Sequence, residues 1–498
     1  PPIPLLYASR VKVSLTSEIY GMYNSSENNI YNSFSFGTGQ GATKNGSDGS
    51  IIITKSETSS GNIIGMQGGK NLYNAYANTS DGVNTNVRAV GKINITHNGY
   101  GDVIGIRGTN SAGKINNALA YLNSAVSDAV AEGSIVLSGK GNVYGIYGNG
   151  TIANSETQFN KNYNMLKDFS SHGVIDVTTR SDTAAAYGIY AAGAKDTKTS
   201  VYNAMGYNST GDIKVRNTSG GSAFGIYSAA QTYTGDDDVV YYNNTYNAFR
   251  SSAIYGDSVA TGNIDMTIEG YSSLGQQVAG IYAAGNAFNS YANSGSDVML
   301  ETIGNITIND KSETGNMNLR GIESNGATIA NAYSTGQNQN TATKVTGNIN
   351  VNILATKNGL STASGIFSDS INPQGTKIYN AALVNDKNNV EGNITVNASS
   401  GRAPNRMYGI YATSYKTGEN AEDAQPKTVY NAYYENGSDV AEGKVRGNIN
   451  VIAKNATTNS MGEYYGIYVQ DGAAYNAYSS NANADVIGTI TVDVVGGA

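Results

Sequence analysis

Cysteine and tryptophan are absent from this 498-residue sequence, and histidine occurs only as His97 and His172. Without cysteine the chain has neither a disulfide framework nor a thiolate metal site. The two histidines lie in different repeat units, which gives little support to a Ser-His-Asp or Cys-His catalytic site. No apolar run approaches the roughly 18 residues of a membrane-spanning helix. The opening PPIPLLYASR lacks the charged and apolar regions of a signal peptide, and we interpret it as a mature end left after signal removal.

Charge is also scarce. Charged residues make up 14% of the chain, the formal net charge is -7, and no run of basic residues is visible. Nucleic-acid binding needs clustered lysine and arginine to displace counterions, so we expect no nucleic-acid partner. The chain is instead rich in small and turn-forming residues and in tyrosine, with 61 Gly and 37 Tyr. Such a composition suits many short strands joined by turns.

Three short motifs recur in fixed order along nearly the whole chain. The first has the form Gly-x-Ile-x-Val and starts at Gly49, Gly91, Gly133, Gly173, Gly211, Gly262, Gly304, Gly347, Gly392, Gly447 and Gly488. The second is a Gly-Ile or Gly-Met pair, most often in the form YGIY, at Gly21, Gly65, Gly105, Gly145, Gly188, Gly225, Gly280, Gly321, Gly365, Gly409 and Gly466. The third is Asn followed by Ala or Ser, most often in the form YNAY, at Asn32, Asn74, Asn117, Asn154, Asn203, Asn247, Asn289, Asn331, Asn380, Asn431 and Asn476.

This repeat predicts an all-β solenoid. The first motif alternates β-branched and polar residues, as in Ile349 and Val351, which is the signature of a half-buried strand. A unit of this size cannot bury its own apolar face, so its neighbours must stack on it. We expect a right-handed parallel β-helix of about 11–12 coils, with roughly 42 residues and three strands per coil. Two coils per unit would double the rod from about 55 Å to about 110 Å, and the short spacing from Asn203 to Gly211 favours one coil.

The repeated asparagines are expected to point inward and form a core ladder. Apolar residues such as Ile30 and Phe34 stand two positions before and after the Asn, which places all three on one face of an ideal strand. Asn side chains stacked about 4.8 Å apart can pair with one another and with turn backbone. The alternative places the small residue after the Asn, such as Ala75, inward at a tight corner and the Asn outside.

The second motif predicts a shallow furrow. If Ile146 and Tyr144 point inward, the glycine between them faces out beside an exposed tyrosine. A glycine at a bend or bulge is the simpler reading. A furrow of bare backbone for self-association is the other, with the members Gly145, Tyr147, Gly188, Tyr190, Gly225, Tyr227, Gly409 and Tyr411.

No linker divides the chain. We expect a divergent N-terminal coil or cap over residues 1–20 and one continuous solenoid over residues 21–498, with long loops at 226–246 and 410–430. Loops on one side of a rigid rod are natural places for binding. The first loop holds Asp236, Asp237 and Asp238, weak candidates for a Ca²⁺ site. A solvated acidic loop is the simpler interpretation, so we expect no cofactor or metal.

Parallel β-helices also carry glycosidases and lyases, which need carboxylates at matched separation. Candidates are Asp176, Asp265 and Glu269, with Arg180 and Arg216. Spacing singles out no pair among them. We therefore expect no enzyme.

Units of GNINV, YGIY and YNAY in a cysteine-free chain resemble the passenger region of bacterial autotransporters (type V secretion) over nearly all of residues 9–494. The resemblance implies an extracellular β-helix in Gram-negative bacteria that acts as an adhesin, a surface fibre or an enzyme scaffold. The C-terminal membrane barrel of that family is not seen after Val494.

From the repeat and this resemblance we expect an extracellular or cell-surface structural or adhesive protein, associated with the bacterial surface or outer membrane. It would assemble with itself into a filament, sheath or surface layer, or bind a host or neighbouring-cell surface. A carbohydrate-binding or carbohydrate-cleaving β-helix is the alternative, and a phage fibre or tailspike the third.

Overall fold

The computed structural model describes most of the chain. The described residues are 17–26, 28–37, 43–56, 60–80, 85–109, 113–123, 127–159, 168–193, 198–229, 232–234, 240–251, 258–270, 275–294, 300–312, 317–336, 344–355, 362–369, 375–385, 387–399, 406–413, 426–436, 443–456, 462–481 and 484–496. Most of the expected N-terminal coil therefore lies outside them, and the first strand begins at Ile19.

Three parallel sheets of 11 strands each make up the fold. Sheet A holds the second motif and consists of β1 (Ile19–Asn24), β4 (Ile63–Gly68), β7 (Val103–Gly108), β10 (Val143–Gly148), β13 (Ala186–Ala191), β16 (Ala223–Ser228), β21 (Gln276–Ala283), β24 (Met317–Ser324), β27 (Thr362–Ser368), β30 (Arg406–Thr413) and β33 (Glu463–Gln470). Sheet B holds the third motif and consists of β2 (Ile30–Gly37), β5 (Leu72–Thr79), β8 (Lys114–Leu122), β11 (Thr151–Phe159), β14 (Ser200–Met205), β19 (Asn244–Ser251), β22 (Asn286–Ser294), β25 (Thr328–Gly336), β28 (Thr376–Val384), β31 (Lys427–Glu435) and β34 (Gly472–Ser479).

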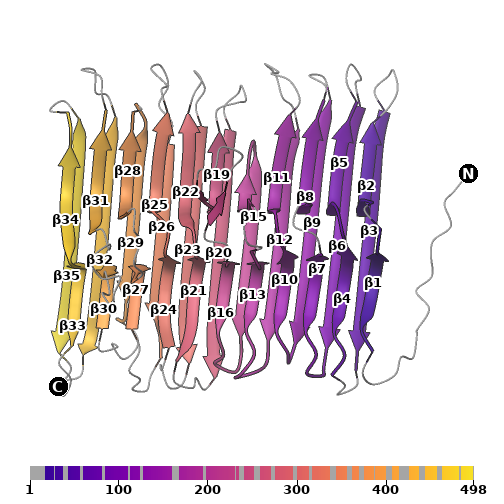
Figure 1. The fold of residues 1–498 in the computed structure, drawn as a ribbon, viewed down its shortest axis with the longest axis horizontal. Coiled ribbons are helices and arrows are strands. Elements are labelled where there is room, and N and C mark those ends of the chain that lie inside the picture. Colours follow the sequence, from indigo (N-terminus) through magenta and orange to yellow (C-terminus); the bar gives the residue numbers. More distant parts are fainter. Residues whose placement is uncertain are drawn as a thin grey trace, which may run out of the picture.

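Sheet C holds the first motif and consists of β3 (Thr43–Lys55), β6 (Thr85–His97), β9 (Asp128–Gly139), β12 (Phe169–Thr179), β15 (Ser209–Asn217), β20 (Ser258–Gly270), β23 (Leu300–Ser312), β26 (Lys344–Ile353), β29 (Asn389–Asn397), β32 (Lys444–Ala456) and β35 (Asp485–Gly496). The chain visits the sheets in the order A, B, C, so each repeat unit is one coil of three strands (Figure 1). The predicted parallel β-helix, with one coil per unit, is confirmed.

Motif residues of successive coils stack in register. Gly91 of β6 pairs with Gly133 of β9, and Ile93 pairs with Ile135. The inward Ile and Val side chains of the first motif are buried, with Ile349 and Val351 both 0% exposed. They join inward residues of sheets A and B in one hydrophobic cluster that runs the length of the rod. This continuous core is what the period-2 pattern predicted.

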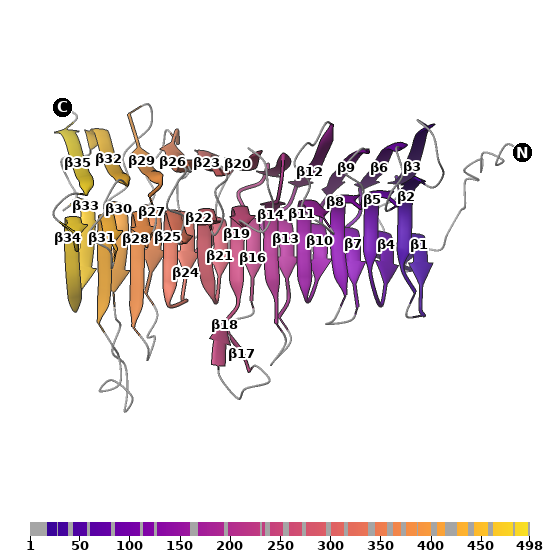
Figure 2. The ribbon, with the colours of Figure 1, turned by 90° about the horizontal axis from the view of Figure 1, so that it is seen from above.

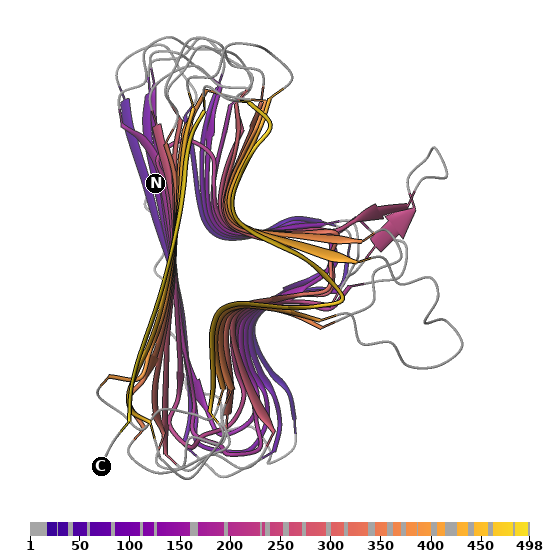
Figure 3. The same cartoon turned by 90° about the vertical axis from the view of Figure 1, so that its left-hand side faces the viewer.

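The cross-section of the rod is pinched in the middle. Seen end-on, sheet C forms one nearly straight wall, and the two other sheets each make a sharp bend that approaches it (Figure 3). The strand pairing of sheet A skips Gly145, and that of sheet B skips Asn154. Each strand is therefore interrupted at its motif residue, which places the bend there. Sheets A and B meet at an edge opposite sheet C (Figure 2). There the loop at 226–246 carries a small antiparallel hairpin of β17 (Thr232–Thr234) and β18 (Val240–Tyr242).

The bends break the strict alternation of an ideal strand. In β10 both Gly145 and Ile146 face the interior, and the tyrosines on either side of this pair, Tyr144 and Tyr147, are only partly buried. In β5 both Asn74 and Ala75 are 0% exposed, whereas Tyr76 beyond them is partly exposed. Two successive inward residues at each bend therefore move the following aromatic residue to the outer face.

Candidate interaction surfaces

The repeated asparagines form a hydrogen-bonded ladder along the rod. Asn289 Nδ2 donates to the side-chain Oδ1 of Asn331 in the next coil at 2.8 Å and to the carbonyl oxygen of Gly304 in its own coil at 2.8 Å. A third acceptor, the carbonyl oxygen of Asn348, lies at 3.2 Å. The same pattern links Asn32 to Asn476 through every intervening coil. Each buried amide is thus paired, which removes the desolvation cost that an isolated amide would carry.

The three motifs interlock across the interior. A side chain built on Gly173 of sheet C would overlap with the carbonyl oxygen of Asn154 at the sheet B bend. A side chain on Gly145 at the sheet A bend would overlap with Cγ2 of Ile175 in sheet C and with the carbonyl oxygen of Gly188. The first-motif glycine therefore makes room for the asparagine bend, and the following isoleucine fills the space under the glycine bend. This mutual fit explains why the motifs recur together.

The predicted furrow of bare backbone is wrong in one respect. The glycines of the second motif, Gly145, Gly188, Gly225 and Gly409, face sheet C and not solvent. At the bend each glycine and the isoleucine after it both point inward, whereas successive residues of an ideal strand point to opposite faces. The tyrosines assigned to the furrow do lie outside: Tyr147, Tyr190, Tyr227 and Tyr411 are partly exposed. Tyr144, which was expected inside, and Tyr187, which pairs with it in the next coil, are partly exposed as well.

The outer side of the sheet A bend therefore carries columns of stacked aromatic rings. Tyr147, Tyr190, Tyr227 and Tyr282, from β10, β13, β16 and β21, follow one another with centroid separations of 5.1, 5.0 and 4.5 Å. We call these residues the four-tyrosine stack. A second column packs edge-on against it, since Tyr144 lies 5.4 Å from Tyr147 at an interplanar angle of 87°. The rings therefore fix one another in position.

The sheet B bend carries an equivalent pair of columns. Tyr246 stacks on Tyr202 and on Phe288, each at 5.1 Å. The residues two positions after the asparagines form the other column, in which Tyr291 stacks on Phe249 at 5.4 Å and on Tyr333 at 5.5 Å. Aromatic clusters thus follow both bends along the rod.

Charged residues interrupt each column. In sheet A, Arg320 and Glu323 of β24 form an ion pair, and the Arg320 guanidinium lies 3.4 Å from the centroid of the Phe367 ring. Burial raises the pKa of Glu323, against the opposing effect of Arg320. In sheet B, Glu156 takes an aromatic position and accepts hydrogen bonds from Asn116 and Gln158. Both carboxylates are paired within the rod, so they serve as structural groups in the columns.

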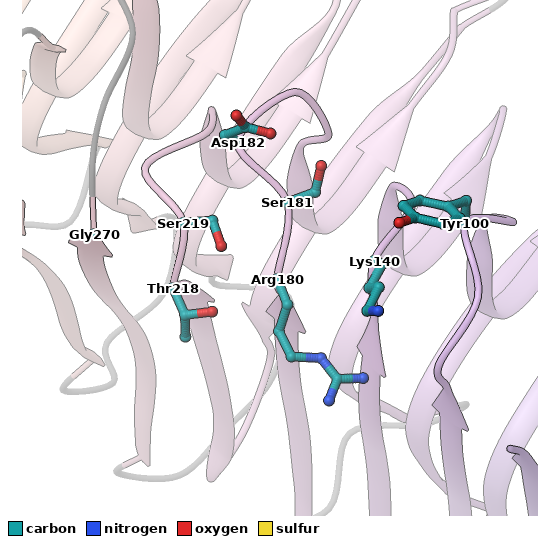
Figure 4. Close-up of a pocket in the computed structure, with 8 residues that line it drawn as sticks. All are labelled: Tyr100, Lys140, Arg180, Ser181, Asp182, Thr218, Ser219 and Gly270. Atoms are coloured by element: carbon teal, nitrogen blue, oxygen red, sulfur yellow. The ribbon is translucent and has the colours of Figure 1, made fainter. Parts of the chain in front are cut away.

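A polar pocket lies where sheet C strands turn toward sheet A (Figure 4). Its volume is about 560 Å³, and it is lined by Tyr100, Lys140, Arg180, Ser181, Asp182, Thr218, Ser219 and Gly270. Arg180 Nη2 donates to the carbonyl oxygen of His97 at 3.3 Å and to Asn98 Oδ1 at 3.2 Å. Lys140 Nζ lies 5.6 Å from the ring centroid of Tyr100, whose side chain is 69% exposed. Sequence reasoning named only Arg180 here, because the turns that gather the others carry no motif.

The candidate catalytic carboxylates do not converge. Glu269 and Arg216 form an ion pair with 2.7 Å between Nη2 and Oε2. Asp176 and Asp265 stand in the same row of sheet C, but Lys214 of the strand between them occupies the paired position. Among the described residues no group of three or more histidines and carboxylates is placed to hold a metal ion. Asp236, Asp237 and Asp238 lie outside the described residues, as does most of the loop at 410–430.

The two histidines have opposite environments. The His172 ring lies 2.8 Å from Asp212 Oδ2, and this hydrogen bond raises the pKa of His172 and lowers that of Asp212. His97 is 0% exposed, and burial, together with the nearby charge of Lys55, lowers its pKa. The residues lie in different coils, so they do not form a joint site.

Comparisons of the chain with protein-family models, with curated proteins and with solved structures found no match. In the part of the chain that the structure describes, no helix has the length and apolar character to cross a bilayer.

Proposed function

We propose that this chain is a secreted or cell-surface structural or adhesive solenoid that associates with itself into a filament, sheath or surface layer. The composition is consistent with such a role, since charged residues make up only 14% of the chain and cysteine is absent. Weak charge reduces the repulsion that keeps copies apart. A rigid rod with repeated surfaces also offers the same contact many times over.

The single observation that carries the proposal is the pair of aromatic bends. Partly exposed tyrosines such as Tyr147, Tyr190 and Tyr227 follow the sheet A bend at a spacing close to that of the coils. Tyrosine is enriched in protein interfaces because it combines a large apolar area with a polar tip. A second rod aligned along the bend would meet a tyrosine on each of four consecutive coils, at Tyr147, Tyr190, Tyr227 and Tyr282. Contacts that are weak for one coil would therefore add up along the rod.

The ring arrangement also bears on the carbohydrate alternative. Sugar rings bind to the open faces of aromatic side chains, but each face inside the four-tyrosine stack is covered by the next ring, with interplanar angles of 3°, 3° and 7°. The edges and hydroxyl groups are what remain for a partner. The observation that favours the alternative is the polar pocket, where Lys140, Arg180 and the exposed Tyr100 would suit an acidic saccharide.

Negative-stain electron microscopy across a range of protein concentrations tests the proposal. We expect ordered filaments or sheets that become more abundant as concentration rises. A Tyr190→Ser, Tyr227→Ser double variant should form filaments or sheets only at a higher protein concentration than the wild type, because it removes two rings from the sheet A bend. Tyr100→Ser is the matched control, since it removes an exposed tyrosine outside the aromatic columns and should leave assembly unchanged.

Isolated rods at every concentration would contradict self-assembly and give precedence to a ligand at the polar pocket. Assembly that depends on Tyr100 and not on the sheet A bend would keep a polymer but refute the surface assigned to it.

A further inference from the structure

The four-tyrosine stack has a geometry suited to covalent chemistry between coils. Its rings are nearly parallel, with interplanar angles of 3° between Tyr147 and Tyr190, 3° between Tyr190 and Tyr227, and 7° between Tyr227 and Tyr282. The centroids are separated by 5.1, 5.0 and 4.5 Å in the same order. Tyrosines in phase on adjacent strands keep this proximity permanently, whereas in an unfolded chain they would meet only by diffusion.

The surroundings hold the rings in place and leave them reachable. Tyr144, Tyr187 and Phe224 pack edge-on against the stack, at angles of 87°, 83° and 77° to their partners in the same strand. All four side chains of the stack are partly exposed. Burial is the main cause that raises the pKa of Tyr190, Tyr227 and Tyr282, so these phenols are protonated at neutral pH.

We propose that this stack is a site of oxidative cross-linking, at which neighbouring coils are joined by dityrosine. A one-electron oxidant takes one electron from each of two adjacent tyrosines, and each phenol releases its hydroxyl proton to water. The two phenoxyl radicals couple through a new carbon–carbon bond between ring positions ortho to the oxygens. Each of these carbons then loses its hydrogen as the hydroxyl group is restored. In total, two tyrosines and two oxidant molecules give one dityrosine, two reduced oxidant molecules and two protons.

Because of the position of the stack, this bond would join neighbouring coils covalently. Tyr190 and Tyr227 belong to β13 and β16, which are joined only by hydrogen bonds and packing. A covalent link would close a loop of one full coil and lower the entropy of its open state. Successive links at Tyr190–Tyr227 and Tyr227–Tyr282 share a ring, so each molecule has several ways to couple the same coils.

Photo-oxidation of the full chain with tris(bipyridine)ruthenium and persulfate tests the proposal, because this small oxidant works in both native buffer and urea. Dilute protein is oxidised in each, and tryptic peptides are mapped by mass spectrometry. In native buffer we expect peptides joined between Tyr190 and Tyr227 or between Tyr227 and Tyr282, each with the loss of two hydrogen atoms. The product should show dityrosine fluorescence and remain a single chain on a denaturing gel. In urea the same linked peptides should fall severalfold.

A matched variant separates the stack from the other tyrosines. The double variant Tyr190→Phe, Tyr282→Phe keeps an aromatic ring at each position but leaves no two adjacent phenols in the stack. Phenylalanine fits such a column, since the ring of Phe367 stacks on that of Tyr411 with 5.0 Å between the centroids. Its far-ultraviolet spectrum should match that of the wild type, and its links at these positions should disappear. Links between Tyr433 and Tyr478, which stack at 5.2 Å in sheet B, should persist as an internal control.

Three results would overturn the proposal. One is an absence of linked stack peptides in native protein that does yield dityrosine elsewhere. Another is equal yield at the stack in native buffer and in urea, which would show that stacking has no part. The third is a product dominated by links between chains through Tyr100, which is 69% exposed and would react first if exposure alone decided the outcome.

Discussion

His97 and His172 are the only histidines, and the fold perturbs them in opposite directions. The hydrogen bond to Asp212, assisted by the charges of Asp212 and Glu132, raises the pKa of His172 although partial burial opposes it. Burial lowers the pKa of His97. A raised histidine pKa contributes stability that is present below about 6.5 and lost as pH rises through the folded value. The lowered pKa of His97 has the opposite sign, because stability falls as pH drops below about 6.5 and the buried ring must charge.

Proton NMR of the histidine rings should therefore resolve two titrations, one on each side of the ordinary value. In Asp212→Asn the pKa of His172 should fall because the carboxylate that stabilises its charged form is gone. The pKa of His97, which lies in another coil, should stay where it was and serves as the control within the same spectrum. Unchanged His172 titration in this variant would refute the assigned pair.

At the scale of the element, the asparagine ladder is the feature that ties the sheet B bend to sheet C. Asn289 accepts from Asn247 and donates to groups in its own coil and the next. Asn476 makes the same bond to its own coil, from Nδ2 to the carbonyl oxygen of Gly488 at 2.8 Å, but its side chain is exposed. The two positions thus share a motif and differ in burial.

We expect Asn289→Ala to lower the free energy of unfolding by about 1–3 kcal/mol for each buried partner left unpaired. Asn476→Ala should cost less, because water can replace the lost bonds at an exposed position. Urea unfolding followed by circular dichroism would compare the two variants through their midpoints. Equal shifts of the two urea midpoints would mean that the asparagine ladder stabilises the fold no more at a buried position than at a solvent-exposed one.

The strands themselves could be predicted from the sequence, and the bends could not. Ile349 and Val351 alternate with polar residues over a whole strand, so their inward direction follows from the period of two. At Gly145 and at Asn74, the motif residue and the residue after it both face inward. A period of two predicts that only one of two successive residues does so. The inward asparagines were expected, but the aromatic residues two positions later, such as Phe34, were placed on the wrong side.

The polar pocket was unpredictable for a different reason. Tyr100, Lys140, Arg180 and Thr218 come from turns of different coils, and their meeting depends on how far each turn extends from the rod. Turn lengths vary between coils without a repeating pattern, so no spacing in the sequence marks this group. Only the stacking of the coils brings it together.

At the scale of the whole molecule, protection from unfolding should vary along the rod. Strands in the middle pair on both sides, and Ile306 of β23, for example, is 0% exposed. In the last described coil the residue in the same column of sheet C, Ile490 of β35, is 37% exposed. A solenoid unit contacts only its neighbours, so opening can begin at one end without disturbing the centre.

Hydrogen exchange measured by mass spectrometry should accordingly show the slowest amides in the strands of sheets A, B and C between β13 and β28, and faster exchange in β1 to β3 and β33 to β35. The gradient follows from the number of paired neighbours, and it should appear in dilute protein where the rods are separate. Uniform protection from one end to the other would show that the rod opens as a single cooperative unit.

The interlocking of the three motifs bears on how such a chain can change over generations. Each coil meets the next through asparagine on asparagine in sheet B and glycine on glycine in sheet C, so these two contacts depend on position within a coil and not on which coil it is. Recombination between two copies of the repeat that removes or adds a whole unit would leave these asparagine and glycine contacts in place at every surviving junction. Exchange out of phase would place a tyrosine at a position where only glycine fits. The length of the rod can therefore change over generations in steps of one coil.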